Sequence, residues 1–301
     1  MITRRTFLAT SGSVAAAGSS GFSAETNPLF SVGLIADAQY VDADPGGIRH
    51  YRNSIKKLSA AVKSINEADV DFSIHLGDLI DRDFASFDDI LEPLRDLKSS
   101  VYQILGNHDF SVAEDKKPEV AAKMGITNPY YAFSKGGVRF IFLDGTEVST
   151  FAQPKGSTIH QQASEMLAEY VAKGRKSAKS WNAAIGPEQM KWLEAQLKEA
   201  ASSGDKAIIS CHYPILPDNS HNLWNDQEVL AVIERFPGVV VAWLNGHNHA
   251  GNYGERNGVH FVTIQGMVDT PDSNAFAVMD VLPDRLKIRG SGRVPDRELR
   301  F

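Results

Sequence analysis

Five short segments of this chain place side chains that can bind a metal ion directly after a run of apolar residues. They are Asp37-Ala38-Gln39, Gly77-Asp78, Gly106-Asn107-His108-Asp109, Cys211-His212 and Gly246-His247-Asn248-His249, and they follow residues 29–35, 72–76, 101–105, 207–210 and 239–244. Short apolar runs of this kind are typical of buried β-strands. In an open α/β sheet, ligands bind in the crevice beyond the carboxyl ends of the strands. We therefore expect the five segments to meet at one site.

The chemistry of these side chains indicates a pair of divalent metal ions. Oxygens of Asp, Gln and Asn together with neutral imidazoles suit Mn²⁺, Fe²⁺, Co²⁺ or Zn²⁺ better than Ca²⁺. The segments offer two Asp, one Gln, one Asn and three His as ligands, and these seven are more than one tetrahedral ion uses. They suit two ions roughly 3.5–4 Å apart that share one carboxylate. Two such cations attract phosphate oxygens and lower the pKa of a bound water. The sequence therefore predicts metal-assisted hydrolysis of a phosphate ester or anhydride.

The order of the five segments resembles the calcineurin-like metallophosphoesterase superfamily, and the resemblance extends over residues 30–292. It implies that Asp78 bridges two metal ions. One ion would be held by Asp37, Gln39, Asp78 and His249, and the other by Asp78, Asn107, His212 and His247. It also implies that His108 binds no metal but donates a proton or hydrogen bond to the phosphoryl group. Asp81 would then orient His108.

Gln39 departs from the pattern of most superfamily members, which have His at this position. Gln followed by Tyr40 is similar to the manganese-dependent ADP-ribose/CDP-alcohol diphosphatases, and residues 49–54, 222–225 and 271–276 are similar to the same branch. An amide oxygen is a harder ligand than an imidazole, which favours Mn²⁺. The alternative is that Gln39 is a drifted ligand in an impaired enzyme.

Three further residues are candidate contacts for the substrate. Arg82 fits the superfamily motif as a phosphate contact. Arg52 opens an amphipathic helix after the first segment, and its guanidinium suits phosphate, although Arg on a helix face is usually solvated. Trp224 either stacks on a base or packs under a loop. Outside these motifs, we expect the remaining histidines to lie at the surface or to pack in the core.

These observations and the resemblance together predict a dinuclear phosphohydrolase. A metal-bridging hydroxide would attack the phosphoanhydride of a nucleoside-diphosphate-linked small molecule of the ADP-ribose/CDP-alcohol type. One alternative is a phosphodiesterase or phosphomonoesterase of broader range in the same superfamily. Another is a non-catalytic protein that binds metal or nucleotide.

The elements that must position these residues alternate along the chain. Apolar residues recur at helical spacing over residues 51–65, 90–97 and 163–171, and a further helix is expected to start at Gly186-Pro187. Hairpins are expected for residues 131–143 and 275–289. The pattern indicates an α/β fold with a mixed sheet, or two packed sheets, and helices outside. The resemblance implies a four-layer α/β/β/α sandwich of two mixed sheets, with residues 147–184 as a peripheral insertion.

Composition limits the other functions open to this protein. The 301 residues are 43% hydrophobic, which is enough for a full core, and the formal net charge of −6 argues against an extended nucleic-acid surface. Cys211 is the only cysteine, so an internal disulfide and a zinc-thiolate site are excluded. We expect this thiol to be buried and structural, because the side chain of neighbouring His212 points to the other face of the strand.

The N-terminal residues are expected to form a targeting signal rather than part of the folded domain. Residues 3–8, which contain Arg4 and Arg5, resemble a twin-arginine export signal followed by a weakly apolar run. That run is too short and too rich in Gly and Ser to span a bilayer. We therefore predict a signal in residues 1–26 and a single domain in residues 27–301. The domain would be exported by the twin-arginine machinery to the periplasm or outside the cell, without stable membrane association. A disordered N-terminus with a chance Arg pair is the alternative.

Overall fold

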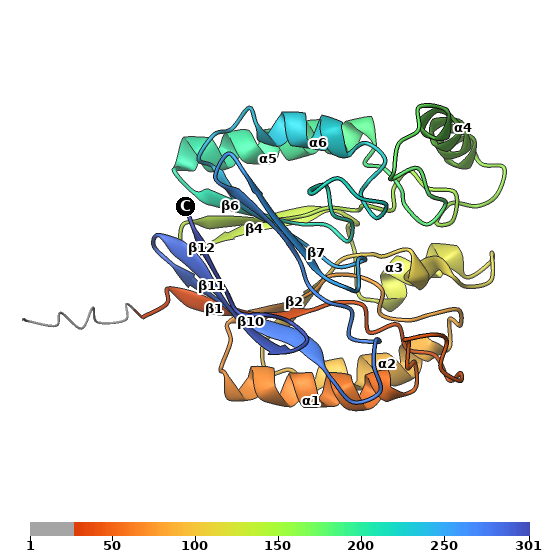
Figure 1. Cartoon of the computed structure of the whole chain (residues 1–301), viewed down its shortest axis with the longest axis horizontal. Helices are drawn as coiled ribbons and strands as arrows, with labels where there is room; N and C mark the ends of the chain where they lie inside the picture. Colours follow the sequence, from red (N-terminus) through yellow and green to blue (C-terminus); the bar gives the residue numbers. More distant parts are fainter. Residues whose placement is uncertain (1–26) are drawn as a thin grey trace, which may run out of the picture.

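Two mixed β-sheets form the centre of the molecule, as seen in the computed structural model of residues 27–301 (Figure 1). The first sheet has the order β12-β11-β10-β1-β2-β3. Its strands are β1 (Phe30–Ile35), β2 (Phe72–His75), β3 (Ser100–Gln103), β10 (Ala275–Leu282), β11 (Arg285–Gly292) and β12 (Arg297–Arg300). Within it, β1, β2 and β3 run parallel, and β10, β11 and β12 add antiparallel pairs. The carboxyl ends of β1, β2 and β3 therefore lie at the same edge.

The second sheet repeats this plan with the order β4-β5-β6-β7-β9-β8. Its strands are β4 (Tyr131–Lys135), β5 (Val138–Phe142), β6 (Lys206–Ser210), β7 (Val240–Asn245), β8 (Asn252–Arg256) and β9 (Val259–Thr263). The pairs β5·β6, β6·β7 and β7·β9 are parallel, whereas the hairpins β4·β5 and β8·β9 are antiparallel. Both predicted hairpins, β4·β5 and β10·β11, are confirmed.

The faces of the two sheets that meet form the central core. Phe72 of the first sheet and Phe140 of the second lie edge to face, with ring centroids 5.0 Å apart. Both are buried within one apolar cluster that draws residues from both sheets. Close packing between sheets fixes their relative position, so strand ends in one sheet keep a constant distance from strand ends in the other.

Helices cover the two outer faces of this sandwich (Figure 1). On the first sheet lie α1 (Asn53–Glu67) and α2 (Ser86–Arg95), and on the second lie α5 (Pro187–Ser203) and α6 (Asp226–Ile233). The short helices η1 (His108–Phe110), η2 (Lys117–Glu119) and α3 (Val120–Lys123) follow β3. The predicted four-layer α/β/β/α sandwich is confirmed, and α5 begins with Pro187 after Gly186, as expected. Cys211 is buried in this structure, and burial raises the pKa of its thiol to about 12, which agrees with a structural role.

The predicted insertion, residues 147–184, contains the helix α4 (Thr158–Ala172) and lies at one end of the molecule (Figure 1). Its two ends are joined by a β-bridge in which Val148 and Ala184 exchange backbone hydrogen bonds of 3.0 Å. The predicted signal in residues 1–26 lies outside the residues that the structure describes. Among residues 27–301, no helix has the length and apolar character needed to cross a membrane.

Candidate metal centre and active site

The structure brings the predicted ligands together beyond the carboxyl ends of β1, β2 and β3 in the first sheet and of β6 and β7 in the second. Asp37 follows β1, Asp78 follows β2, and His212 follows β6 after one intervening residue. The links between them are short: Gln39 Nε2 lies 3.0 Å from both Asp78 Oδ2 and His249 Nε2. His249 Nε2 lies 3.4 Å from Asp37 Oδ1. The expectation that these segments meet is therefore confirmed.

The backbone at these strand ends turns sharply to aim the side chains inward. Asp37, Gln39, Asp78 and His247 have φ angles of 52°, 45°, 59° and 66°, a region that residues other than glycine rarely occupy. Such strained residues are typical of functional sites, where the surrounding structure holds them in place. Four of the seven predicted ligands share this feature.

The glycines that precede the ligands allow two strand ends to approach each other. A Cβ atom on Gly106 would overlap the Asp78 carboxylate, and one on Gly246 would overlap the Asp37 carboxylate. Glycine at these positions thus lets each carboxylate lie against the backbone of a neighbouring segment. In the second case, the Asp37 carboxylate accepts the backbone N–H of His247 at 3.1 Å.

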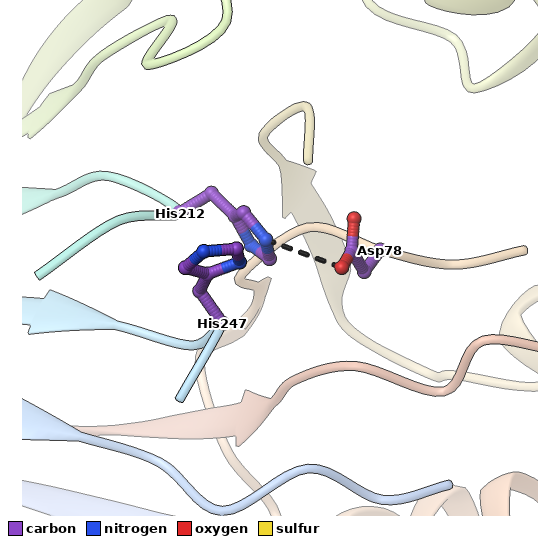
Figure 2. Close-up of side chains that lie close together, drawn as sticks. All are labelled: Asp78, His212 and His247. Atoms are coloured by element: carbon purple, nitrogen blue, oxygen red, sulfur yellow. Dashed lines mark ion pairs between the residues drawn. The ribbon is translucent and has the colours of Figure 1, made fainter. Parts of the chain in front are cut away.

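Asp78, His212 and His247 form a cluster that could hold a metal ion (Figure 2). One potential ligand atom from each lies within 4.8 Å of the others, and all three side chains are buried. His212 Nε2 is 3.2 Å from Asp78 Oδ2. An acid and two imidazoles at this spacing fit a divalent ion of the Mn²⁺ or Zn²⁺ type.

Three buried polar atoms at the site have no hydrogen-bond partner. They are Gln39 Oε1, Asn107 Oδ1 and His212 Nε2, the last of which lies near Asp78 Oδ2 but without the geometry of a hydrogen bond. Buried polar groups in proteins are nearly always satisfied, so an orphaned set points to a ligand. All three belong to predicted metal-binding residues, and the donor set therefore fits divalent metal ions.

Each of the three imidazoles is oriented by a hydrogen bond from its other nitrogen. His212 Nδ1 bonds to the backbone oxygen of Leu76, His249 Nδ1 to Asp269, and His247 Nε2 to Asn182, each at 2.8 Å. The remaining nitrogens of His212 and His249 lie close to other predicted ligands, an arrangement that is usual for metal-binding histidines. Sequence reasoning missed Asp269 and Asn182, which lie outside the five segments.

Charges within the cluster balance one another. Burial opposes ionisation of Asp78, yet His212 and His108 hold the pKa of its carboxyl below its usual range. Burial likewise opposes the charged form of His212, but Asp78 raises the pKa of this imidazole to about 9. The pKa of His249 is also raised to about 9, because Asp269 and Asp37 outweigh its burial. A metal cation would replace these protons, as metal binding to imidazole requires.

His108, to which the resemblance assigns no metal, is held by two hydrogen bonds to carboxylates. Its Nδ1 lies 2.8 Å from Asp81 Oδ1, and its backbone N–H donates to Asp78 Oδ1 at 2.7 Å. Asp81 is buried, and although burial opposes ionisation, the hydrogen bond from His108 helps to hold the pKa of its carboxyl below the usual value. With Nδ1 bonded to Asp81, Nε2 is the ring nitrogen left for a ligand, and His108 lines the main cavity at the predicted metal site.

The pattern of the calcineurin-like phosphoesterase family matches residues 30–251. The chain belongs to this family. With the family, the predicted enzyme class is also confirmed: a hydrolase that acts on phosphate bonds. The predicted ligand roles of individual side chains remain predictions.

Relatives in the family are similar over nearly the whole chain. The manganese-dependent ADP-ribose/CDP-alcohol diphosphatase of Mus musculus is 32% identical over 324 residues, which cover 92% of this chain and 94% of the relative. The enzyme of the same name from Homo sapiens is 30% identical over 91% of this chain and 93% of its own. A solved dimetal phosphatase from Danio rerio has a TM-score of 0.83 and 26% identity, and the match covers 91% of this chain and 100% of that one. GAP50 of Plasmodium, at 15% identity over 90% of this chain and 89% of its own, has a TM-score of 0.59 and shares the fold.

A cavity of about 560 Å³ opens at the predicted metal site of this phosphoesterase. It is lined by Gln39, Arg49, Asp78, Asn107, His108, Ser111, Phe151, Ser180, Trp181, His221, His247 and His249. Phe151, Ser180 and Trp181 come from the insertion between β5 and α5. The cavity is therefore lined by polar side chains that include predicted metal ligands and by two aromatic side chains, Phe151 and Trp181.

The three predicted substrate contacts lie elsewhere. Arg52 forms ion pairs with Asp42 and Asp44 and does not line the cavity. Arg82 pairs with Asp81 at 3.1 Å and its guanidinium lies over the ring of Tyr51. Trp224 is completely buried and donates its indole N–H to the backbone oxygen of Lys179 at 3.0 Å, so it packs rather than presenting a face to a base.

Arg49 and Trp181 line the cavity where Arg52 and Trp224 had been candidates. Nη1 of Arg49 lies 3.4 Å from His108 Nε2. Trp181 is 45% exposed, which leaves part of its ring open to a ligand. Both residues belong to loops, where no periodic pattern in the sequence indicates the direction of a side chain.

Proposed function

We propose that this phosphoesterase hydrolyses the phosphoanhydride bond of small molecules linked to a nucleoside diphosphate, of the ADP-ribose or CDP-alcohol type. The observation that carries the proposal is the set of orphaned ligand atoms on Gln39, Asn107 and His212 beneath an open cavity. The names of relatives at about 30% identity support this choice of substrate. Gln39 supports it as well, because an amide ligand is what distinguishes this branch in sequence.

The proposal includes two divalent ions, with Mn²⁺ preferred. The first would be held by Asp37, Gln39, Asp78 and His249, and the second by Asp78, Asn107, His212 and His247. When bound, these ions supply positive charge for the phosphoryl oxygens and lower the pKa of a water. Asp78 suits the bridging role, because both the Gln39 amide and the His212 ring approach its Oδ2, at 3.0 and 3.2 Å.

The chain's own side chains complete the reaction site. His108 donates a hydrogen bond from Nε2 to the phosphoryl group, and Asp81 stabilises the protonated imidazole through Nδ1. Donors fixed in advance in this way stabilise developing negative charge without a cost of reorganisation. The aromatic wall with Phe151 and Trp181 gives the organic part of the substrate an apolar surface. Products would be a nucleoside monophosphate and a second phosphate monoester.

A substrate panel with the purified, Mn²⁺-loaded protein tests this proposal. We expect turnover of ADP-ribose and CDP-choline with a kcat/KM well above that of bis-4-nitrophenyl phosphate or 4-nitrophenyl phosphate. Turnover of the nitrophenyl esters alone would replace the diphosphatase by a broader phosphodiesterase or phosphomonoesterase.

One substitution distinguishes an enzyme from a non-catalytic protein that only binds metal or nucleotide. His108→Ala removes the donor from Nε2 and leaves all seven proposed ligands in place. We expect activity to fall by about 100-fold or more while bound metal is unchanged. Metal analysis of the same samples should give two ions per chain. Unchanged hydrolysis in His108→Ala would contradict the proposed catalytic role of His108.

We also propose that residues 1–26 direct export through the twin-arginine machinery. The support is the sequence of residues 3–8 and the need to load metal in the folded protein before transport. Replacing both Arg4 and Arg5 by Lys should keep the protein in the cytoplasm of its native host. Export of the doubly substituted protein at the normal level would contradict this proposal.

A further inference from the structure

Arg49 is the cationic side chain best placed to meet a substrate in this structure. It is the only Arg or Lys among the residues that line the main cavity. In the part of the chain that the structure describes, no carboxylate forms an ion pair with it, in contrast to Arg52 and Arg82. Its guanidinium is therefore available to an anion.

Arg49 also lies where two cavities join. A second cavity of about 340 Å³ shares Arg49, His221, His247 and His249 with the main one. Arg293 is the other cation that lines it, but this side chain is bound to Asp269 and to the backbone oxygens of Gly266 and His249. A substrate that occupied both cavities would therefore pass Arg49.

The position of Arg49 is fixed by its backbone. Its N–H and C=O both bond to Gly46, at 3.1 and 3.0 Å, and the flanking residues Ile48 and His50 bond to Thr270 and Val268. The loop is thereby joined to the segment that carries Asp269, the partner of His249. A backbone that is ordered in advance leaves only the side chain to be ordered when Arg49 binds a ligand, which lowers the entropy cost of binding.

Arg49 and His108 converge on one point. With Nδ1 of His108 directed at Asp81, Nε2 is 3.4 Å from Nη1 of Arg49. A phosphate oxygen that enters between them would accept from both groups. A diphosphate diester carries one negative charge on each phosphate, and metal ions held by the proposed ligands would offset the charge of the phosphate that lies over them. The second charge needs another cation.

We propose that Arg49 binds the second phosphate of a diphosphate substrate, next to the bond that breaks, and so determines the preference for diphosphates over single phosphodiesters. This assignment rests on the proposed function and adds a specificity-determining residue to it. Arg suits the role because its planar fork can hold two phosphate oxygens at once.

Kinetics of single substitutions test the assignment. In Arg49→Gln, kcat/KM for ADP-ribose should fall about 10- to 100-fold, the range expected for a lost hydrogen bond to a charged group. Hydrolysis of bis-4-nitrophenyl phosphate, which has one phosphorus, should change by less than about threefold. Arg49→Lys should restore part of the loss, because Lys keeps the charge without the fork. Lys56→Gln, an exposed charge on α1, controls for net charge.

Three outcomes would overturn the assignment. One is an equal loss on both substrates, which would place Arg49 at the attacked phosphate. Another is no loss on ADP-ribose. The third is a larger loss in Arg52→Gln than in Arg49→Gln. The melting temperature and the bound metal are measured for every variant, and a variant that has lost its fold or its metal is excluded from the kinetic comparison.

A binding experiment keeps this assignment separate from the proposed function. Calorimetry with Mn²⁺-loaded protein compares AMP with the non-hydrolysable α,β-methylene analogue of ADP. We expect the wild-type protein to bind the diphosphonate about tenfold more tightly, and Arg49→Gln to remove that difference. If the wild-type protein turns over no diphosphate, the proposed function fails, and this comparison still decides the role of Arg49. An undiminished preference in Arg49→Gln would refute it.

Discussion

His249 Nδ1 lies 2.8 Å from Oδ1 of Asp269, a buried carboxylate 20 residues further along the chain. Arg293 holds the other carboxylate oxygen at 3.3 Å. The bond fixes the imidazole so that Nε2 faces Gln39, at 3.0 Å, and Asp37, at 3.4 Å. A residue outside every metal-binding motif therefore controls the direction of a proposed ligand.

Asp269→Asn should weaken metal binding without removing a ligand. The amide keeps an oxygen that accepts the Nδ1 proton but loses the negative charge that makes the imidazole a better donor. We expect the Mn²⁺ concentration for half-maximal activity to rise about 10- to 100-fold, with kcat largely restored at saturating metal. Asp272→Asn, an exposed acid on the same loop, is the matched control. A loss of kcat that excess Mn²⁺ fails to repair would show a different role for Asp269.

Gln39→His should change which metal supports activity. The substitution replaces an amide oxygen by the imidazole found in most of the superfamily, a softer ligand that suits Zn²⁺ and Fe²⁺ better than Mn²⁺. We expect the ratio of Zn²⁺-supported to Mn²⁺-supported activity to rise relative to wild type. The measurement is hydrolysis by protein that has been stripped of metal and reloaded with each ion. An unchanged ratio would remove Gln39 as the determinant of metal choice.

Gly106→Ala should disrupt the metal site itself. The added methyl group would overlap the Asp78 carboxylate, so either the strand end or the carboxylate must move. We expect loss of bound metal and a decrease of about 1–3 kcal/mol in the free energy of unfolding. Gly204→Ala is the comparison: this residue ends α5 with φ of 74° and has no atom near its added Cβ. Gly204→Ala should lower the free energy of unfolding by about 1 kcal/mol, because alanine is strained at this φ angle, and should leave the metal content unchanged.

Asp144 gives the stability a pH dependence that can be isolated. Burial raises the pKa of this carboxyl to about 6, compared with 3.8 in an unperturbed chain. The folded protein thus holds the proton more tightly than the unfolded chain, and Asp144 removes stability as the pH rises from about 4 to about 6.

Asp144→Asn abolishes this titration and keeps an oxygen for the N–H and hydroxyl of Thr146. We expect the free energy of unfolding of the variant, minus that of wild type, to increase by about 2–3 kcal/mol between pH 4 and pH 7. Urea denaturation of the two proteins at matched pH measures the difference, in which groups common to both cancel. A difference that stays flat with pH would contradict the raised pKa.

The strand-end segments predicted the centre of this site because each one combines a buried strand with its own ligand. To predict that Asp37, Asp78 and His212 meet, one needs only the rule that ligands bind beyond the carboxyl ends of parallel strands. The hairpin at Gly136-Gly137 was equally local, and both glycines have the positive φ angles that its tight turn requires.

The surrounding side chains were less predictable, because loops from distant parts of the chain place them. Arg49 and Arg52 are three positions apart, yet acidic neighbours Asp42 and Asp44 hold Arg52 away from the cavity. Trp181 and Trp224 are equally aromatic, and only tertiary packing decides that Trp224 is buried. Asn182 reaches His247 through the fold of the insertion, for which the sequence offers no motif.

The insertion that closes at Val148 and Ala184 supplies two neighbouring residues with separate tasks. Trp181 belongs to the wall that an incoming molecule meets, and Asn182 holds the ring of His247. Remodelling this segment to admit a new substrate would therefore disturb the affinity for metal at the same time. We therefore expect substrate range and metal loading to change together in this chain, and a screen that engineers one should also select for the other.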